Sequence, residues 1–262
     1  MTIEEAFISA RKICKWANSE IQNFGTAQAA FGANKPYEII TEHHESSGVI
    51  TGVSFKAKLV TNISEELELA AYRVVTDLRN VLDQAVFAAS TVIGTLKPKY
   101  ANFPFALKEL DFKRRLASAE GPYRGIPVNL HPKLTSFRPF MVQDDGSEGN
   151  KVLCFINDMA NPNKHQITLE TRVLPSGIRI KNHRDMNLSL DVEQISDTEF
   201  NVLRGYITGP NPQIDFDVEA NLFIKQAGPF ANKPAFAIFE ELHALVEGIL
   251  TEIEDETLKL TS

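Results

Sequence analysis

The sequence has little cysteine, no excess of positive charge and no long hydrophobic run. Two cysteines among 262 residues, Cys14 and Cys154, provide no disulfide framework, which suits a reducing compartment, and we expect both to be buried, inert thiols. The net charge of -7 argues against a broad DNA- or RNA-binding surface, because neutralising phosphates needs a basic one. The most apolar run, 85–93, is far shorter than the ~20 residues that cross a bilayer.

An N-terminal secretory pattern is also missing, since no basic stretch is followed by an apolar one. These absences together predict a soluble, cytoplasmic protein with no membrane segment.

The usual signatures of catalysis and metal binding are missing too. There is no Gly-rich phosphate loop and no Gly-x-Ser-x-Gly elbow. His43 and His44 are adjacent in a predicted strand, so their side chains would point to opposite faces. The other histidines show no paired ligand spacing. We therefore expect no metal and no cofactor.

The pattern that is present predicts an α+β fold, in which long amphipathic helices pack with a mostly antiparallel sheet. Hydrophobic residues make up 43% of the chain and charged residues 23%, which is ordinary globular composition. We predict one composite domain, 1–262, and no linker divides it. Its predicted parts are a helix at 2–24, a hairpin at 37–60, a central helix at 62–93, an irregular region with short helices at 96–163, a β-rich region at 166–225 and a C-terminal helix at 234–258.

Turn and cap signals set the predicted boundaries. The segment 25–35 reads as a loop, and Pro-Ser-Gly at 175–177 and Gly-Pro-Asn-Pro at 209–212 read as turns between strands. Asn62 with Glu65 three residues later is typical of a capping box at the start of the central helix. Gly94 ends that helix.

Two polar segments stand beside strongly apolar sequence and form the candidate site. The first is Asp-Leu-Arg-Asn-Val-Leu-Asp-Gln at 77–84, which contains Arg79, Asn80 and Asp83. The second is Asn-Pro-Asn-Lys-His-Gln at 161–166, which contains Lys164 and His165. Together these residues supply cations, an orienting amide and a titratable base, which are the ingredients for holding a phosphate. The alternative is a buried polar network, in which Arg79 pairs with Asp83 one helical turn away and no ligand binds.

Four short motifs, in order, resemble those of a family of uncharacterised bacterial and phage-associated proteins. The family pattern is Leu-Arg-x-x-Leu-Asp-His on a long helix, then Phe-Pro-aliphatic, then Arg- or Gln-Pro-aromatic, then Asp-Lys-His-Arg before a β-rich tail. This chain has Leu-Arg-Asn-Val-Leu-Asp-Gln at 78–84, Phe-Pro-Phe at 103–105, Arg-Pro-Phe at 138–140 and Asn-Lys-His-Gln at 163–166.

The Arg-x4-His spacing within that pattern is similar to the motif of HEPN ribonucleases, helical proteins that usually cleave RNA as dimers without a metal. The resemblance implies a homodimer, with Arg79 as the phosphate contact, Asn80 as the polar residue beside it and position 84 as the catalytic histidine. Here that position is Gln84, and glutamine cannot accept and return a proton near neutral pH. The resemblance thus implies a degenerate HEPN-like core.

Three hypotheses follow. In the first, the chain is a non-catalytic binding or interaction protein, with RNA or a nucleotide phosphate held locally by Arg79, Asn80, Asp83 and Lys164. In the second, it is a metal-independent endoribonuclease in which His165 replaces the missing histidine. In the third, the polar residues form a purely structural cluster without a ligand.

Overall fold

The computed structural model of the chain describes residues 2–95, 97–160, 171–225 and 228–262. The chain divides into two compact units. The helical unit comprises Met1–Phe24, Glu68–Leu169 and Gln226–Ser262, and the strand unit comprises Gly25–Leu67 and Glu170–Lys225. Helices and antiparallel strands are both present, so the predicted α+β class is confirmed. The prediction of one composite domain stays a prediction.

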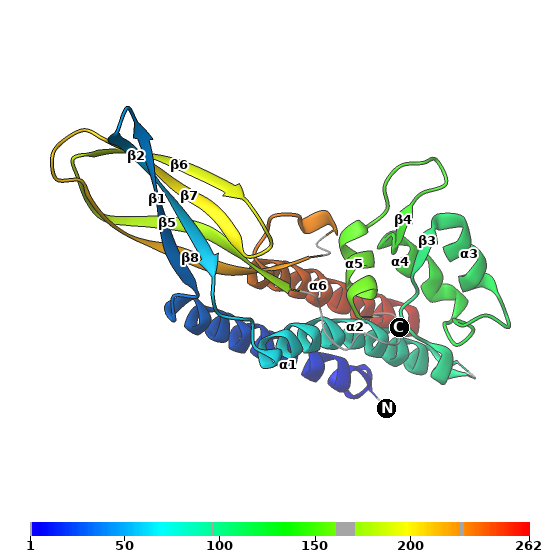
Figure 1. Cartoon of the computed structure of the whole chain (residues 1–262). Helices are drawn as coiled ribbons and strands as arrows, with labels where there is room; N and C mark the ends of the chain where they lie inside the picture. Colours follow the sequence, from blue (N-terminus) through cyan, green and yellow to red (C-terminus); the bar gives the residue numbers. More distant parts are fainter. Residues whose placement is uncertain (1, 96, 161–170, 226–227) are drawn as a thin grey trace. The chain divides into compact units, whose positions relative to one another are not determined.

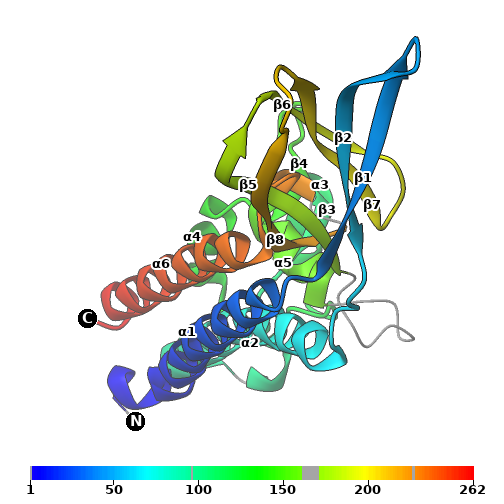
Figure 2. The ribbon, with the colours of Figure 1, turned by 60° about the vertical axis from the view of Figure 1, so that its left-hand side comes forward.

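The helical unit is built on three long helices, α1 (Ile3–Ala33, as far as Phe24), α2 (Glu65–Ile93, from Glu68) and α6 (Ala235–Thr261). They run alongside one another in both ribbon views (Figures 1 and 2). The buried residues of α1 recur in steps of three and four, which places a single seam against its neighbours: Phe7, Ala10, Cys14, Ala17, Ile21 and Phe24. None of the helices in the described residues has the length and apolarity needed to cross a membrane.

The ends of the central helix α2 are well defined. Gly94, with φ of 97°, follows its last residue, and the Gly94 N–H donates to the carbonyl oxygen of Ser90 at 3.2 Å. At the other end the predicted cap at Asn62 is wrong. The helix begins at Glu65, and the Leu67 N–H donates to the hydroxyl oxygen of Ser64 at 3.3 Å. Ser64 is the nearer residue, so its hydroxyl reaches the orphan N–H.

Short elements fill the region that was predicted to be irregular. Two short strands, β3 (Ala106–Lys108) and β4 (Phe140–Val142), pair in parallel, and the sequence did not predict them. The remaining elements of this unit are the helices α3 (Glu109–Ala117), α4 (His131–Ser136) and α5 (Lys151–Ala160) and the 3-10 turns at Pro98–Tyr100, Val128–Leu130 and Gly228–Phe230.

The strand unit contains two antiparallel sheets. A four-stranded sheet has the order β1-β2-β7-β6, and a two-stranded sheet pairs β5 with β8 (Figure 1). The strands are β1 (Tyr37–Ser46), β2 (Val49–Leu59), β5 (Thr171–Arg184), β6 (Met186–Gln194), β7 (Glu199–Ile207) and β8 (Gln213–Ile224). The predicted hairpin is confirmed, with Ser47 and Gly48 at φ of 54° and 79° in its two-residue turn.

The end of α1 differs from the prediction. Residues 25–33, predicted to be loop, continue the helix to Ala33. Four alanines in this stretch favour helix, and the Gln28 side-chain amide donates to Asn221 Oδ1 of β8 at 3.0 Å. Tertiary contact with β8 thus stabilises a helical end that two glycines weaken locally.

The predicted turn at 175–177 is wrong as well. Strand β5 runs through it and stays paired with β8, with a register shift between Pro175 and Gly177. Among the described residues β5 pairs with β8 alone, so the missing N–H of Pro175 is tolerated at a bulge of this two-stranded sheet. The predicted turn at 209–212 is confirmed, because it lies between β7 and β8.

Candidate functional site

The polar residues of α2 bind a neighbouring segment of the helical unit. Arg79 Nη1 forms an ion pair with Asp83 Oδ1, and Arg79 Nη2 donates to the carbonyl oxygen of Phe103 at 3.2 Å. Asp83 Oδ1 accepts the backbone N–H of Phe103 at 2.8 Å. Both backbone polar groups of Phe103 therefore bond to side chains one turn apart on α2. We call this arrangement the Arg79–Asp83 clamp.

Aromatic packing completes the clamp. The guanidinium carbon of Arg79 lies 4.6 Å from the centroid of the Phe105 ring, within the range of a cation–π contact. Phe103 is fully buried, and its ring centroid lies 5.1 Å from that of Phe105. Pro104 disfavours helical backbone at Phe103, so the N–H and the C=O of Phe103 are not used within a helix and bond to α2 instead. The first two motifs of the sequence are thus in direct contact.

Burial and charge act in opposite directions on Asp83. Burial raises the pKa of Asp83, while the Arg79 charge and the Phe103 N–H lower it in part. The side chains of Arg79 and Asp83 are 15% and 25% exposed. The pair is therefore largely withdrawn from water, and its hydrogen-bonding capacity is directed inward.

The structure brings only part of the predicted site together. Arg79 and Asp83 are joined, whereas Asn80 is exposed on α2 and Gln84 is half-buried on the same helix. Lys164 and His165 lie outside the described residues, so their approach to Arg79 stays a prediction. Within the described residues, no group of three or more histidine, cysteine, aspartate and glutamate side chains could hold a metal ion.

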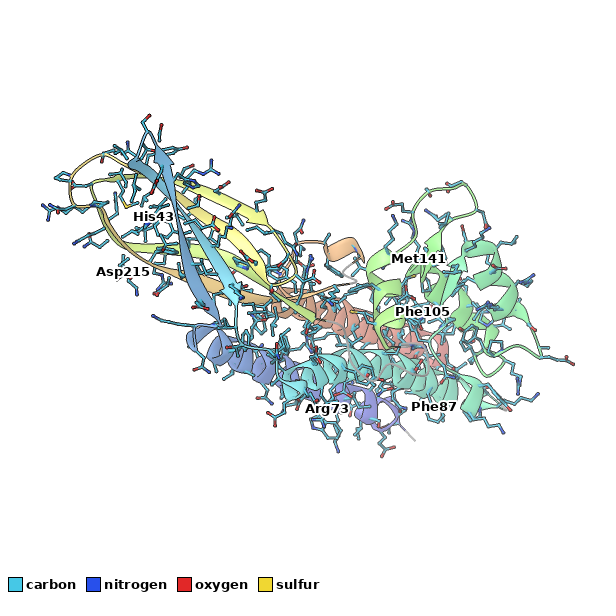
Figure 3. The ribbon with its side chains drawn as sticks, viewed as in Figure 1. His43, Arg73, Phe87, Phe105, Met141 and Asp215 are labelled. Atoms are coloured by element: carbon cyan, nitrogen blue, oxygen red, sulfur yellow. The ribbon has the colours of Figure 1, made fainter. Side chains whose placement is uncertain are left out.

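A cavity of about 190 Å³ lies beside the clamp, and Phe105 forms part of its wall. Sequence reasoning missed it, because its residues come from four short elements and their linkers. Figure 3 shows Phe105 and Met141 in this part of the unit. Burial raises the pKa of the Asp158 carboxyl, and the Asn157 side chain lowers it in part. The cavity is lined by Phe105, Ala106, Leu107, Asp111, Arg115, Met141, Cys154, Asn157 and Asp158.

A second cavity, of about 410 Å³, lies between α1 and α6. Cys14 lines it, and its Sγ lies 3.5 Å from Nε2 of His243, which also lies 3.1 Å from the Cys14 carbonyl oxygen. Burial, reinforced by the charge of Glu247, raises the pKa of Cys14 to about 11. The thiol is therefore protonated near neutral pH and a poor nucleophile, as predicted for a buried cysteine.

Comparison of the chain with protein families, with curated proteins and with solved structures found no match.

Proposed function

We propose that the chain is a non-catalytic binding or interaction protein whose helical unit has a degenerate HEPN-like core. The observation that carries the proposal is the clamp, in which Arg79 and Asp83 bond to each other and to the backbone of Phe103. The motif position that would carry the acid–base histidine is Gln84. In this proposal α2 is a structural axis rather than a catalytic surface.

The geometry favours a structural role for Arg79 over phosphate binding. A phosphate at its guanidinium would compete with the Asp83 carboxylate and with the carbonyl oxygen of Phe103. It would also lie within reach of the Asp83 negative charge, and like charges repel strongly where water is partly excluded. The net charge of -7 adds long-range repulsion of nucleic acid. The proposed partner is therefore a protein, and binding of RNA or a nucleotide is the alternative that the test must detect.

The test follows end-labelled single-stranded RNA incubated with the purified chain in EDTA, together with RNA binding by fluorescence polarisation at several salt concentrations. We expect intact RNA and no salt-sensitive binding. Metal-independent cleavage that disappears in His165→Ala would instead assign the chain as a ribonuclease. Salt-sensitive RNA binding that is lost in Lys164→Ala and Arg79→Met, with folding preserved by circular dichroism, would assign these residues to phosphate.

A further inference from the structure

The cavity of about 190 Å³ beside the clamp is lined by charged side chains from two helices. Arg115 lies one helical turn after Asp111 on α3, and Asp158 lies one turn after Cys154 on α5, so each pair shares one face of its helix. The two helices lie in the same part of the helical unit, together with β3 and β4 (Figure 1). The cavity therefore has a guanidinium on its α3 wall and a carboxylate on its α5 wall.

These two charges do not neutralise each other. Among the described residues, Asp111 pairs with Arg114 at 2.9 Å, and neither Arg115 nor Asp158 takes part in an ion pair. Partial burial raises the pKa of Asp158, the Asn157 side chain lowers it in part, and no cation contributes. Arg115 and Asp158 are therefore both available to charged groups of a ligand.

The remaining wall of the cavity is mainly apolar. The parallel register of β3 and β4 places Leu107 beside Met141 on one face of the ladder. Leu107 is 71% exposed although it lines the cavity, and Phe105 and Met141, labelled in Figure 3, also form part of the wall. A ligand that covered Leu107 would remove apolar surface from water, which favours binding.

We propose that this cavity binds a free apolar α-amino acid of about the size of leucine or methionine. The ligand carboxylate accepts hydrogen bonds from the Arg115 guanidinium, the ligand ammonium group donates to the Asp158 carboxylate, and the ligand side chain covers Leu107 and Met141. Sites for drug-sized ligands have volumes of about 300–1,000 Å³. A cavity of about 190 Å³ suits a smaller molecule, such as a single amino acid.

The pair of opposite charges favours a zwitterion over a ligand with one charge. An anion bound by Arg115 alone would leave Asp158 without a counter-ion and would be repelled by it, and a cation bound by Asp158 alone would be repelled by Arg115. A zwitterion supplies a partner for both walls, so neither charge is left uncompensated when water leaves the cavity.

The site binds its ligand without covalent chemistry. Burial, reinforced by the charge of Asp158, raises the pKa of the Cys154 thiol to about 12, so the thiol stays protonated near neutral pH. The inference goes beyond the proposed function, because it names a small-molecule ligand and a different set of residues. It does not require the clamp to be non-catalytic.

Isothermal titration calorimetry of the full-length chain with leucine and two analogues tests the proposal. Leucinamide lacks the carboxylate, and isocaproate lacks the ammonium group. We expect leucine to bind with a dissociation constant between about 10 µM and 1 mM. Each analogue should bind about 10- to 100-fold more weakly, because it loses one charge-assisted interaction.

Two variants assign the charges of the ligand to the walls of the cavity. Arg115→Gln should weaken leucine binding about 10- to 100-fold and leave leucinamide binding unchanged, because leucinamide has no carboxylate to lose a partner. Asp158→Asn should weaken leucine binding similarly and leave isocaproate binding unchanged. Arg73→Gln and Glu240→Gln make the same charge changes at exposed positions outside the cavity and should bind leucine like the unaltered chain.

Three results would overturn the assignment. These are no binding of leucine or methionine up to about 10 mM, analogues that bind as tightly as leucine, and leucine binding that is unchanged in both cavity variants. Circular dichroism of each variant checks that the fold is intact. None of these results bears on the RNA assays, so failure of the amino-acid site leaves the non-catalytic role of the clamp to be judged separately.

Discussion

Replacing Asp83 with alanine should destabilise the helical unit more than a surface substitution would. The change removes the counter-ion of Arg79 and the acceptor of the Phe103 N–H in one step. Both groups are then left with fewer partners in a region that is largely withdrawn from water, and unsatisfied buried polar groups are costly.

The magnitude follows from the two lost interactions. A hydrogen bond to a charged group contributes about 1.5–3 kcal/mol, and removing one member of a fully buried ion pair costs about 3–5 kcal/mol. The Arg79 side chain is still 15% exposed, so water partly offsets the cost of leaving its charge without a counter-ion. We therefore expect Asp83→Ala to lower the free energy of unfolding by about 2–4 kcal/mol.

Asp83→Asn is the matched control, because asparagine keeps an oxygen that can accept the Phe103 N–H. Burial already opposes the Asp83 charge, as its raised pKa indicates, so removing the charge alone should cost only about 1–2 kcal/mol. Arg79→Met removes the other partner. The double variant with Asp83→Ala should lose about 1–2 kcal/mol less than the sum of the single losses, since the two sites are coupled.

Urea unfolding followed by far-UV circular dichroism measures these differences. Asp83→Ala within about 0.5 kcal/mol of the unaltered chain would refute the reasoning, because neutral surface changes scatter by that amount. Strict additivity of Arg79→Met and Asp83→Ala would also refute it, because the clamp would then not act as a unit.

Three further predictions concern pH, thiol reactivity and glycine packing. Because the pKa of Asp83 is raised in the folded protein, its protonation favours the folded state. The stability of the unaltered chain relative to Asp83→Asn should therefore increase as the pH falls from above the folded-state pKa towards the ordinary value of 3.8, and be lost as the pH rises through the folded-state pKa. Urea unfolding at several pH values measures this difference. Burial raises the pKa of Cys14 to about 11 and that of Cys154 to about 12, so a thiol reagent at pH 8 should label neither until denaturant is added. A methyl group on Gly149 would overlap the backbone carbonyl oxygen of Phe140, so Gly149→Ala should destabilise the fold by at least about 1–3 kcal/mol. Gly248 lies on α6 with open space around it, so Gly248→Ala should stabilise the fold by about 0.5–1 kcal/mol. Thermal unfolding measures both changes.

Periodicity alone determined most of the elements of this chain. The apolar stripes of α2 and α6 recur at helical spacing, and their burial follows directly from that spacing. The turn at Ser47 and Gly48 could also be predicted from local sequence, because only a few residue types readily adopt positive φ. Each of these features depends on residues that are close together in the sequence.

Only the tertiary structure decided what the polar residues of α2 contact. The spacing of Arg79 and Asp83 indicated that they could pair, but nothing local indicated that the backbone of Phe103, 20 residues beyond Asp83, would complete the bonding. The extension of α1 to Ala33 and the passage of Pro175 through β5 likewise depend on β8. That β6 pairs with β7 alone among the described residues was equally hidden, because alternation shows which face of a strand is apolar but not which strands lie beside it. Local patterns determine where a chain can bury surface, whereas the partner that buries it is chosen by contacts between distant segments.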